Sequence, residues 1–195
     1  MHLVIYGPEG SGKGTQAKLL SDKLGIPIYT AGDLVRWSAT NDEGYIGDLA
    51  RKVLGEGTYL SDTEMCQLLE AKIKKSDAQG GFILDGFPRS LAQAQFIMKL
   101  SEKLNFHIDR VIYLKLGSKD SILRLVKRKR KLYSTSNILH DDPERIKKRL
   151  KIYKALEKEL LDFYKKKNLL LEIDGSRTIE EVHSDIVSGL RIYKG

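Results

Sequence analysis

A glycine-rich loop near the start of the chain carries the residue types that bind phosphate groups. Residues 7–15 read Gly-Pro-Glu-Gly-Ser-Gly-Lys-Gly-Thr, which is the spacing G-x-x-x-x-G-K. Glycines let the backbone curl so that its N–H groups converge on an anion, and the following helix adds its positive end. The Lys13 ammonium can reach β- and γ-phosphates, and the hydroxyl of Thr15 or Ser11 can lie near a magnesium ion. The loop therefore predicts binding of a nucleoside triphosphate, without naming the acceptor.

Such a loop needs a strand before it and a helix after it, and the surrounding pattern supplies both. Short apolar runs predict five strands, at His2–Tyr6, Ile26–Tyr29, Phe82–Leu84, Arg110–Leu114 and Leu169–Ile173. All but the second are nearly continuously apolar, which is typical of parallel strands buried on both faces.

Helical patterns lie between these runs. Shared apolar faces group Ala17, Leu20 and Leu24 on one helix, and Leu91, Ala94 and Met98 on another. Capping sequences predict further helix starts at Ser61–Glu64, with a helix through Ile73, at Asp142–Pro143 and at Thr178–Glu181. Strands that alternate with helices predict an α/β fold with a parallel sheet.

The composition bounds the class of protein. A chain of 195 residues, 41% of them hydrophobic, suits one folded domain with small insertions. No apolar run approaches the length of a transmembrane helix, and the first strand begins too early for a signal peptide. Cys66 is the only cysteine, which excludes an intrachain disulfide and a multi-cysteine metal site. We therefore expect a cytoplasmic protein without zinc.

Two stretches fit the alternation poorly. Residues 31–60 are polar and punctuated by glycines, and residues 129–140 are first basic and then polar. Both are candidates for mobile insertions over a ligand, and the alternative is that they are ordinary surface loops.

Further motifs follow the predicted strands. Gly32-Asp33-Leu34-Val35-Arg36 follows the second strand and Asp85-Gly86-Phe87-Pro88-Arg89-Ser90 the third, and Arg124, Arg128, Lys147-Lys148-Arg149-Leu150 and Asp174-Gly175-Ser176-Arg177 come later. In this order, beside the Gly-Lys-Gly-Thr loop, they resemble the adenylate kinase family of nucleoside monophosphate kinases over essentially the whole chain. The resemblance implies a three-layer P-loop fold with a five-stranded parallel core and the reaction MgATP + AMP ⇌ 2 ADP. It implies a core of residues 1–30, 61–128 and 141–195, a monophosphate-binding segment at 31–60 and a short lid at 129–140.

The resemblance also implies roles for individual residues. Phosphoryl transfer between two nucleotides needs cations that stabilise spreading negative charge. The implied ATP site is Gly10, Ser11, Gly12, Lys13, Gly14, Thr15, Arg124, Arg128 and Arg177. The implied AMP site is Ala31, Gly32, Arg36, Thr58, Tyr59, Leu60, Met65, Gly86, Phe87, Arg89, Gln93 and Arg149. The implied catalytic set is Lys13, Arg89, Arg124, Arg128 and Arg149, with Mg²⁺ near Thr15 and held through water by Asp85.

The chain departs from the family pattern in places that bear on the substrate. Ala31 stands where adenylate kinases usually have threonine and where UMP and CMP kinases often have alanine, whereas Gln93 favours adenine. We expect AMP, with a UMP/CMP kinase or a broad-specificity kinase as the alternative. The arginine that usually ends the lid is absent, and Arg130 or Lys131 are candidates to replace it.

The formal charge of +8, from 34 Lys+Arg against 26 Asp+Glu, is compatible with other functions. Lys127–Lys131 and Lys165–Lys167 are basic runs that a nucleic-acid-binding P-loop module could use, but no recognition motif accompanies them. A nucleotide sensor without catalysis is a third possibility. We expect a monomer that binds ATP and AMP, with no nucleic acid and no membrane.

Overall fold

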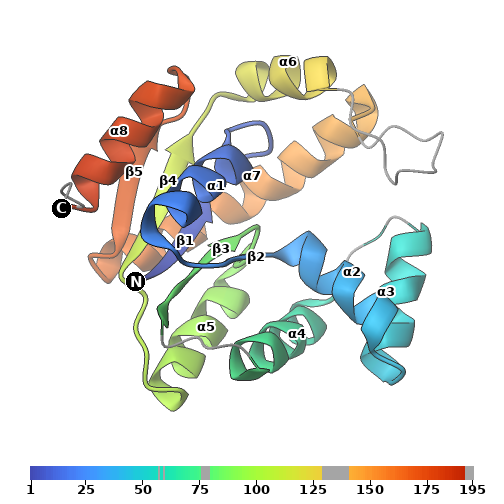
Figure 1. Ribbon diagram of the computed structural model, residues 1–195. Helices are drawn as coiled ribbons and strands as arrows, with labels where there is room; N and C mark the ends of the chain where they lie inside the picture. Colours follow the sequence, from blue (N-terminus) through green and yellow to red (C-terminus); the bar gives the residue numbers. More distant parts are fainter. Residues whose placement is uncertain (57, 59, 76–79, 129–140, 192–195) are drawn as a thin grey trace.

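Five parallel strands form a single sheet in the computed structural model, which describes residues 1–56, 58, 60–75, 80–128 and 141–191. The strands are β1 (His2–Tyr6), β2 (Ile28–Thr30), β3 (Phe82–Asp85), β4 (Arg110–Lys115) and β5 (Leu170–Asp174). Their order is β2-β3-β1-β4-β5, so β1 lies in the middle with β3 and β4 beside it (Figure 1). The predicted α/β fold and parallel sheet are confirmed, and each predicted strand lies within two residues of an observed one.

Helices cover both faces of this sheet (Figure 1). One face carries α1 (Lys13–Leu24) and α8 (Ile179–Gly189). The other carries α4 (Asp62–Lys75), α5 (Leu91–Lys103) and α7 (Pro143–Lys166). The remaining helices are α2 (Ala31–Asn41) and α3 (Tyr45–Glu56), beyond the β2 edge, and α6 (Ser118–Arg128), which follows β4. The result is the three-layer arrangement that the resemblance implied.

The core explains why the strands read as continuous apolar runs. In β1, Leu3 and Ile5 belong to the cluster under α1 and α8, whereas Val4 and Tyr6 belong to the cluster under α5 and α7. All four are at most 6% exposed. Because both faces of the strand are buried, these four residues are all apolar and do not alternate with polar ones.

The predicted helix starts are also present. Ser61 and Glu64 bond reciprocally through their side chains and backbone N–H groups, although the helix runs to Lys75 instead of Ile73. A capping box joins Thr178 and Glu181, and the Asp142 carboxylate caps α7. Capping side chains that accept from the unpaired N–H groups of a first turn explain these boundaries.

Segment 31–60 contains two helices, although its polar composition did not predict them. The Thr30 hydroxyl caps α2 by accepting from the Asp33 N–H at 2.9 Å. The start of α3 packs so closely on the end of α2 that a Cβ on Gly47 would lie 1.8 Å from the Asp42 carbonyl oxygen. A glycine is therefore required there by the close approach of two backbones. Segment 129–140, predicted as a lid, lies outside the described residues.

In the part of the chain that the structure describes, no helix has the combination of length and apolar character needed to cross a membrane.

Replacing Leu20 with alanine tests the packing of α1 on the sheet. Leu20 is fully buried among side chains of β1, β4 and α8, so the cavity should lower the free energy of unfolding by about 2–5 kcal/mol. Denaturant unfolding measures the loss. Leu123→Ala is the matched control, because Leu123 is 68% exposed on α6 and should change stability by no more than about 0.5 kcal/mol. Equal losses in the two variants would contradict this packing.

Candidate functional site

The glycine-rich loop lies at the carboxyl end of the central strand. It connects β1 to α1. The order of the strands reverses direction at β1, because β2 and β3 lie on one side of it and β4 and β5 on the other. Open parallel sheets bind ligands at such a switch point, outside the carboxyl ends of the strands. Gly12 precedes the first turn of α1 with φ 92° and ψ 10°, a left-handed conformation, and the first turn of α1 carries no acidic side chain. The start of α1 therefore keeps the positive end that an anion would use.

Lys13 lies folded back onto this loop. Its ammonium donates to the carbonyl oxygens of Gly7 and Pro8, each at 2.9 Å. Burial lowers the pKa of Lys13 from 10.5 to about 8, although the negative charges of Asp85 and Glu9 act in the opposite direction. Burial has removed part of the water around this ammonium group, and a phosphate group would give it a negatively charged hydrogen-bond acceptor in place of neutral carbonyl oxygens.

Asp85 ends β3 next to the same loop. One of its carboxylate oxygens lies 3.6 Å from the position that a Cβ on Gly14 would take, so the carboxylate faces the first turn of α1. Burial raises the pKa of Asp85, and the positive charges of Lys13 and Arg89 oppose that shift. A carboxylate in this position can therefore bind a cation that arrives with phosphate groups.

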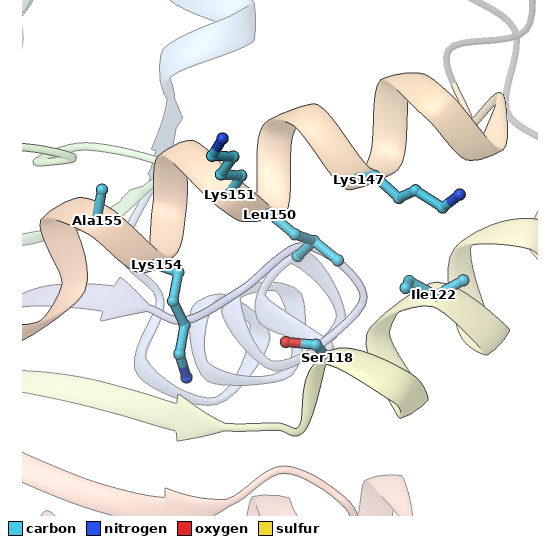
Figure 2. A pocket seen from close by; sticks show the side chains of 7 residues that line it. All are labelled: Ser118, Ile122, Lys147, Leu150, Lys151, Lys154 and Ala155. Carbon is cyan, nitrogen blue, oxygen red and sulfur yellow. The ribbon is translucent and has the colours of Figure 1, made fainter.

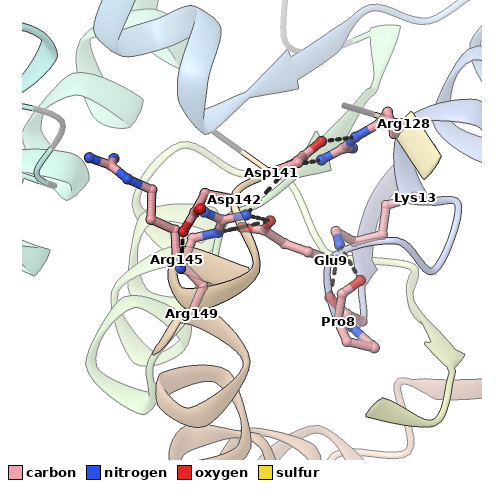
Figure 3. A network of polar contacts seen from close by, with 9 residues as sticks. Pro8, Glu9, Lys13, Arg128, Asp141, Asp142, Arg145 and Arg149 are labelled. Carbon is pink, nitrogen blue, oxygen red and sulfur yellow. Dashed lines mark hydrogen bonds and ion pairs between the residues drawn. The ribbon is translucent and has the colours of Figure 1, made fainter. Parts of the chain in front are cut away.

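Two arginines and two carboxylates form a network beside the loop (Figure 3). Arg149, from α7, donates through Nε to both carboxylate oxygens of Glu9 at 3.0 Å, and its Nη2 lies 2.9 Å from Oε2. Arg128, from α6, contacts Asp141 with Nε at 2.8 Å and Nη2 at 2.9 Å. Arg149 Nη2 also lies 3.5 Å from Asp141, whose side chain is fully buried. Asp141 therefore bridges the ends of α6 and α7.

Arg124 joins the loop to the turn after β5. Its guanidinium donates to the carbonyl oxygens of Gly175 at 2.9 Å, Ser176 at 3.0 Å and Gly10 at 3.4 Å. Arg177, in the same turn, forms an ion pair with Asp185 on α8. The structure thus brings Lys13, Arg124, Arg128 and Arg149 together around one loop, with Arg177 on its α8 side.

The residues predicted to bind the phosphate of the monophosphate lie just after β2 and β3. Arg36 pairs with Asp33 one turn earlier in α2, and the arginine side chain is 62% exposed. A hydrogen bond from Thr30 and the charge of Arg36 lower the pKa of Asp33. Arg89 donates through Nε to the Gly86 carbonyl oxygen at 2.8 Å. Both guanidinium groups therefore rest on local partners that a phosphate could replace.

Gln93 is 4% exposed, and both ends of its amide are bonded. Its Oε1 accepts from the Arg89 backbone N–H at 2.7 Å, and its Nε2 donates to Asp62 at 2.6 Å. The bonds hold the amide of the predicted base-contacting residue in one orientation.

The other predicted residues divide into buried and exposed groups. Ala31, Met65 and Phe87 belong to the apolar core, each at most 7% exposed. The Ser11 hydroxyl is buried with no hydrogen-bond partner among the described residues, whereas Thr15 is exposed at the start of α1. Thr58 is exposed, Leu60 is half-buried, and Tyr59 lies outside the described residues.

Sequence reasoning missed Glu9, Asp141 and Asp62. A carboxylate inside an anion-binding loop is an anomaly in the sequence, and that anomaly could have indicated that Glu9 has a cationic partner. Asp141 precedes the helix cap Asp142, and it reads there as a second capping residue. Asp62 lies in a first helical turn, where acidic residues are ordinary.

A shallow pocket of about 490 Å³ lies between α6 and α7, and none of the residues of this network lines it (Figure 2). Ile122, Leu150 and Ala155 give it apolar walls, and lysines surround it. Two of these lysines pair with Glu144 and Glu157. Of the described residues that line the pocket, none belongs to the predicted site.

Comparisons with known proteins agree with the motifs. Residues 5–169 match the family model described as Adenylate kinase. The relative named Adenylate kinase from Cyanothece sp. is 39% identical over 184 residues, which cover 94% of this chain and 92% of the relative. The Adenylate kinase of Methanocella arvoryzae is 32% identical over 214 residues, with 98% and 99% covered. That of Fusobacterium nucleatum is 35% identical over 205 residues, with 95% and 96% covered.

Replacing Asp141 with asparagine tests the bridge between α6 and α7. Removing its charge leaves Arg128 and Arg149 without a common charged partner, which should lower the free energy of unfolding. Because Arg128 is 42% exposed, solvent screens part of this effect, and we expect a loss of about 2–3 kcal/mol. Asp142→Asn is the control, since asparagine caps a helix as well as aspartate does. Denaturant unfolding that shows no difference between the two variants would contradict a structural bridge at Asp141.

The pKa of Lys13 predicts how binding of a nucleoside triphosphate depends on pH. The free protein loses the Lys13 charge above about pH 8, whereas a bound polyphosphate requires that charge. The dissociation constant should be constant below about pH 8 and rise toward tenfold per pH unit above it. Calorimetric titrations across this range measure it. Lys13→Arg keeps its charge and should remove the dependence, so the same slope in both proteins would contradict the assignment.

Proposed function

The chain belongs to the adenylate kinase family and is a nucleoside monophosphate kinase, and we propose that its own residues perform the reversible transfer of a phosphoryl group from MgATP to AMP, giving two ADP. The observation that carries this proposal is the convergence of Lys13, Arg124 and Arg149 on one glycine-rich loop, with Arg128 held beside it by Asp141. Four cations around a phosphate-binding loop suit a reaction whose transition state spreads charge over phosphoryl oxygens.

On the ATP side, we assign the phosphates to the loop residues Gly10, Ser11, Gly12, Lys13, Gly14 and Thr15, with Arg124 and Arg128 beside them and Arg177 toward the base. The buried Ser11 hydroxyl supports this assignment, because it lacks a partner among the described residues. Lys13 would exchange two carbonyl oxygens for phosphate oxygens, and that exchange gains a full opposite charge.

On the AMP side, Arg36 and Arg89 hold the phosphate and Gln93 contacts the adenine. Ala31, Gly32, Thr58, Tyr59, Leu60, Met65, Gly86 and Phe87 line the rest of this proposed site. The local partners of both arginines support the assignment, since the contacts of Arg36 with Asp33 and of Arg89 with Gly86 keep each guanidinium in place before the substrate arrives. A clamp that is already positioned loses less conformational entropy on binding.

Arg149 contacts the phosphoryl group that moves between the two nucleotides in this proposal. In the free protein Arg149 forms an ion pair with Glu9, whose carboxylate accepts the hydrogen bonds that a phosphate would accept. Lys13 comes from the end of the loop and Arg124 and Arg128 come from α6, so the transferring group would meet cations from several elements at once. Positioning and charge stabilisation then account for the catalysis, and no general base is required.

The residues present fit a magnesium ion that arrives with ATP. Asp85 is a hard oxygen ligand held against the first turn of α1, and burial raises its pKa, so a nearby cation is favourable. Thr15 offers a hydroxyl on the same helix. When bound, magnesium neutralises the charge of the phosphates, and Asp85 would hold it through water.

The insertions and the core have separate roles in the proposed enzyme. Residues 31–60 act as the monophosphate-binding segment, and residues 129–140, which lie outside the described residues, act as a short lid whose closure excludes water. The core is then 1–30, 61–128 and 141–195. We propose a monomeric, cytoplasmic enzyme that does not use its basic runs for nucleic acid.

A substrate panel with one inactive variant tests the function. Coupled assays with ATP and AMP, UMP, CMP, GMP or dTMP should show AMP as the preferred acceptor. Lys13→Met should lose turnover by a factor on the order of 10³ while keeping its melting temperature, because a charge aimed at the phosphates is removed. Lys18→Met, an exposed lysine in the same helix, is the control and should retain activity. A comparable rate with CMP and none with AMP would contradict the substrate, and full activity of Lys13→Met would contradict the site.

A further inference from the structure

The Asp62 carboxylate joins the N-terminal ends of two helices. Asp62 is the first residue of α4, and Ser90 is the N-cap of α5. Asp62 Oδ2 accepts from the Ser90 hydroxyl at 2.5 Å, and Oδ1 accepts from Gln93 Nε2 at 2.6 Å. Both helix ends favour a negative charge at this point. Asp62 is therefore a fixed acceptor placed directly against the Gln93 side chain.

Two contacts decide which way round the Gln93 amide lies. A carboxylate only accepts hydrogen bonds, so the amide group facing Asp62 must be the NH₂. The Arg89 backbone N–H only donates, so the atom facing it at 2.7 Å must be Oε1. Reversing the amide would set oxygen against carboxylate and NH₂ against N–H. At 4% exposure, Gln93 has little access to water that could compensate for these losses.

The locked amide still has one N–H and one lone pair to offer. Side by side, they match a base that presents an amino group next to a ring nitrogen acceptor, as adenine and cytosine do. The amino group would donate to Oε1, and the ring nitrogen would accept from Nε2. Guanine, hypoxanthine and uracil present a carbonyl next to a ring N–H, which would oppose acceptor to acceptor and donor to donor.

We propose that Asp62 is a positioning residue for base specificity, which holds Gln93 in the orientation that accepts amino bases and rejects oxo bases. The inference rests on the proposed function, in which Gln93 contacts the base. Asp62 hydrogen-bonds Gln93 and Ser90, so in this proposal it acts on the base through Gln93.

The fixed orientation of Gln93 predicts a different grouping of substrates from the one that Ala31 suggests. An alanine only removes a hydroxyl, so Ala31 does not distinguish an amino base from an oxo base. The orientation of Gln93 places AMP together with CMP and opposes both to UMP and GMP. The site would then select bases mainly by the hydrogen-bonding groups on their edge and less by the size of the ring.

AMP and IMP form the matched pair for the test, because these purines differ only at the edge that Gln93 would contact. The experiment measures kcat/KM for both in the wild type, Asp62→Asn and Thr63→Ala. An asparagine can turn either its oxygen or its NH₂ toward Gln93, so Asp62→Asn should lower the AMP-over-IMP ratio by about tenfold. Thr63, exposed in the same turn, should leave the ratio unchanged when replaced. The CMP-over-UMP ratio should move in the same direction.

Parallel losses for AMP and IMP in Asp62→Asn, with an unchanged ratio, would overturn the inference, because a merely structural role predicts that result. If Asp62→Asn does not fold, Asp62→Ser replaces it, since a hydroxyl also donates or accepts and serine suits a helix start. A wild type that phosphorylates no monophosphate would overturn the proposed function and this inference together. A wild type that phosphorylates AMP and IMP equally well would overturn the inference alone.

Discussion

Mutual repulsion among cations is the constraint on which the site depends. Lys13, Arg124, Arg128 and Arg149 meet at the carboxyl end of the sheet, and the free protein can hold them there only with internal acceptors and negative partners. Glu9 and the buried Asp141 pair with Arg149 and Arg128, while carbonyl oxygens of the loop and of the turn after β5 accept from Lys13 and Arg124. The contacts of Arg124, Arg128 and Arg149 also join separate elements, so the same bonds that balance the charge place α6 and α7 against the loop.

A site built this way is positioned before substrate binds. Arg149 already points at the loop because Glu9 holds it, and Gln93 already has one orientation because Asp62 and Arg89 hold it. Binding then replaces internal partners with phosphate oxygens, and few side chains need to be newly ordered. The carboxylate of Glu9 is the part of this arrangement that an incoming phosphate must displace.

Local patterns in the sequence predicted much of this molecule. The strands were readable because burial on both faces of β1 and β3 makes each one a continuous apolar run, and the capping pairs Ser61–Glu64 and Thr178–Glu181 marked helix starts. The helices α2 and α3 were not predicted, because glycines interrupt their segment and the two helices depend on close packing against each other at Gly47. The loop was recognisable from nine consecutive residues, whereas Glu9 and Arg149 are 140 residues apart and only the fold brings them together. The charge of +8 indicated a polyanion, and the structure places Lys13, Arg124, Arg128 and Arg149, from three helices, close to one loop.

The most direct test of this account is a crystal structure of the protein with a two-substrate analogue, in which two adenosines are joined by five phosphates. The account predicts that the phosphate chain lies along the loop in contact with Lys13, Arg128 and Arg149, and that Arg149 has exchanged Glu9 for a phosphate oxygen. An analogue bound elsewhere, with the Arg149–Glu9 pair intact, would contradict it.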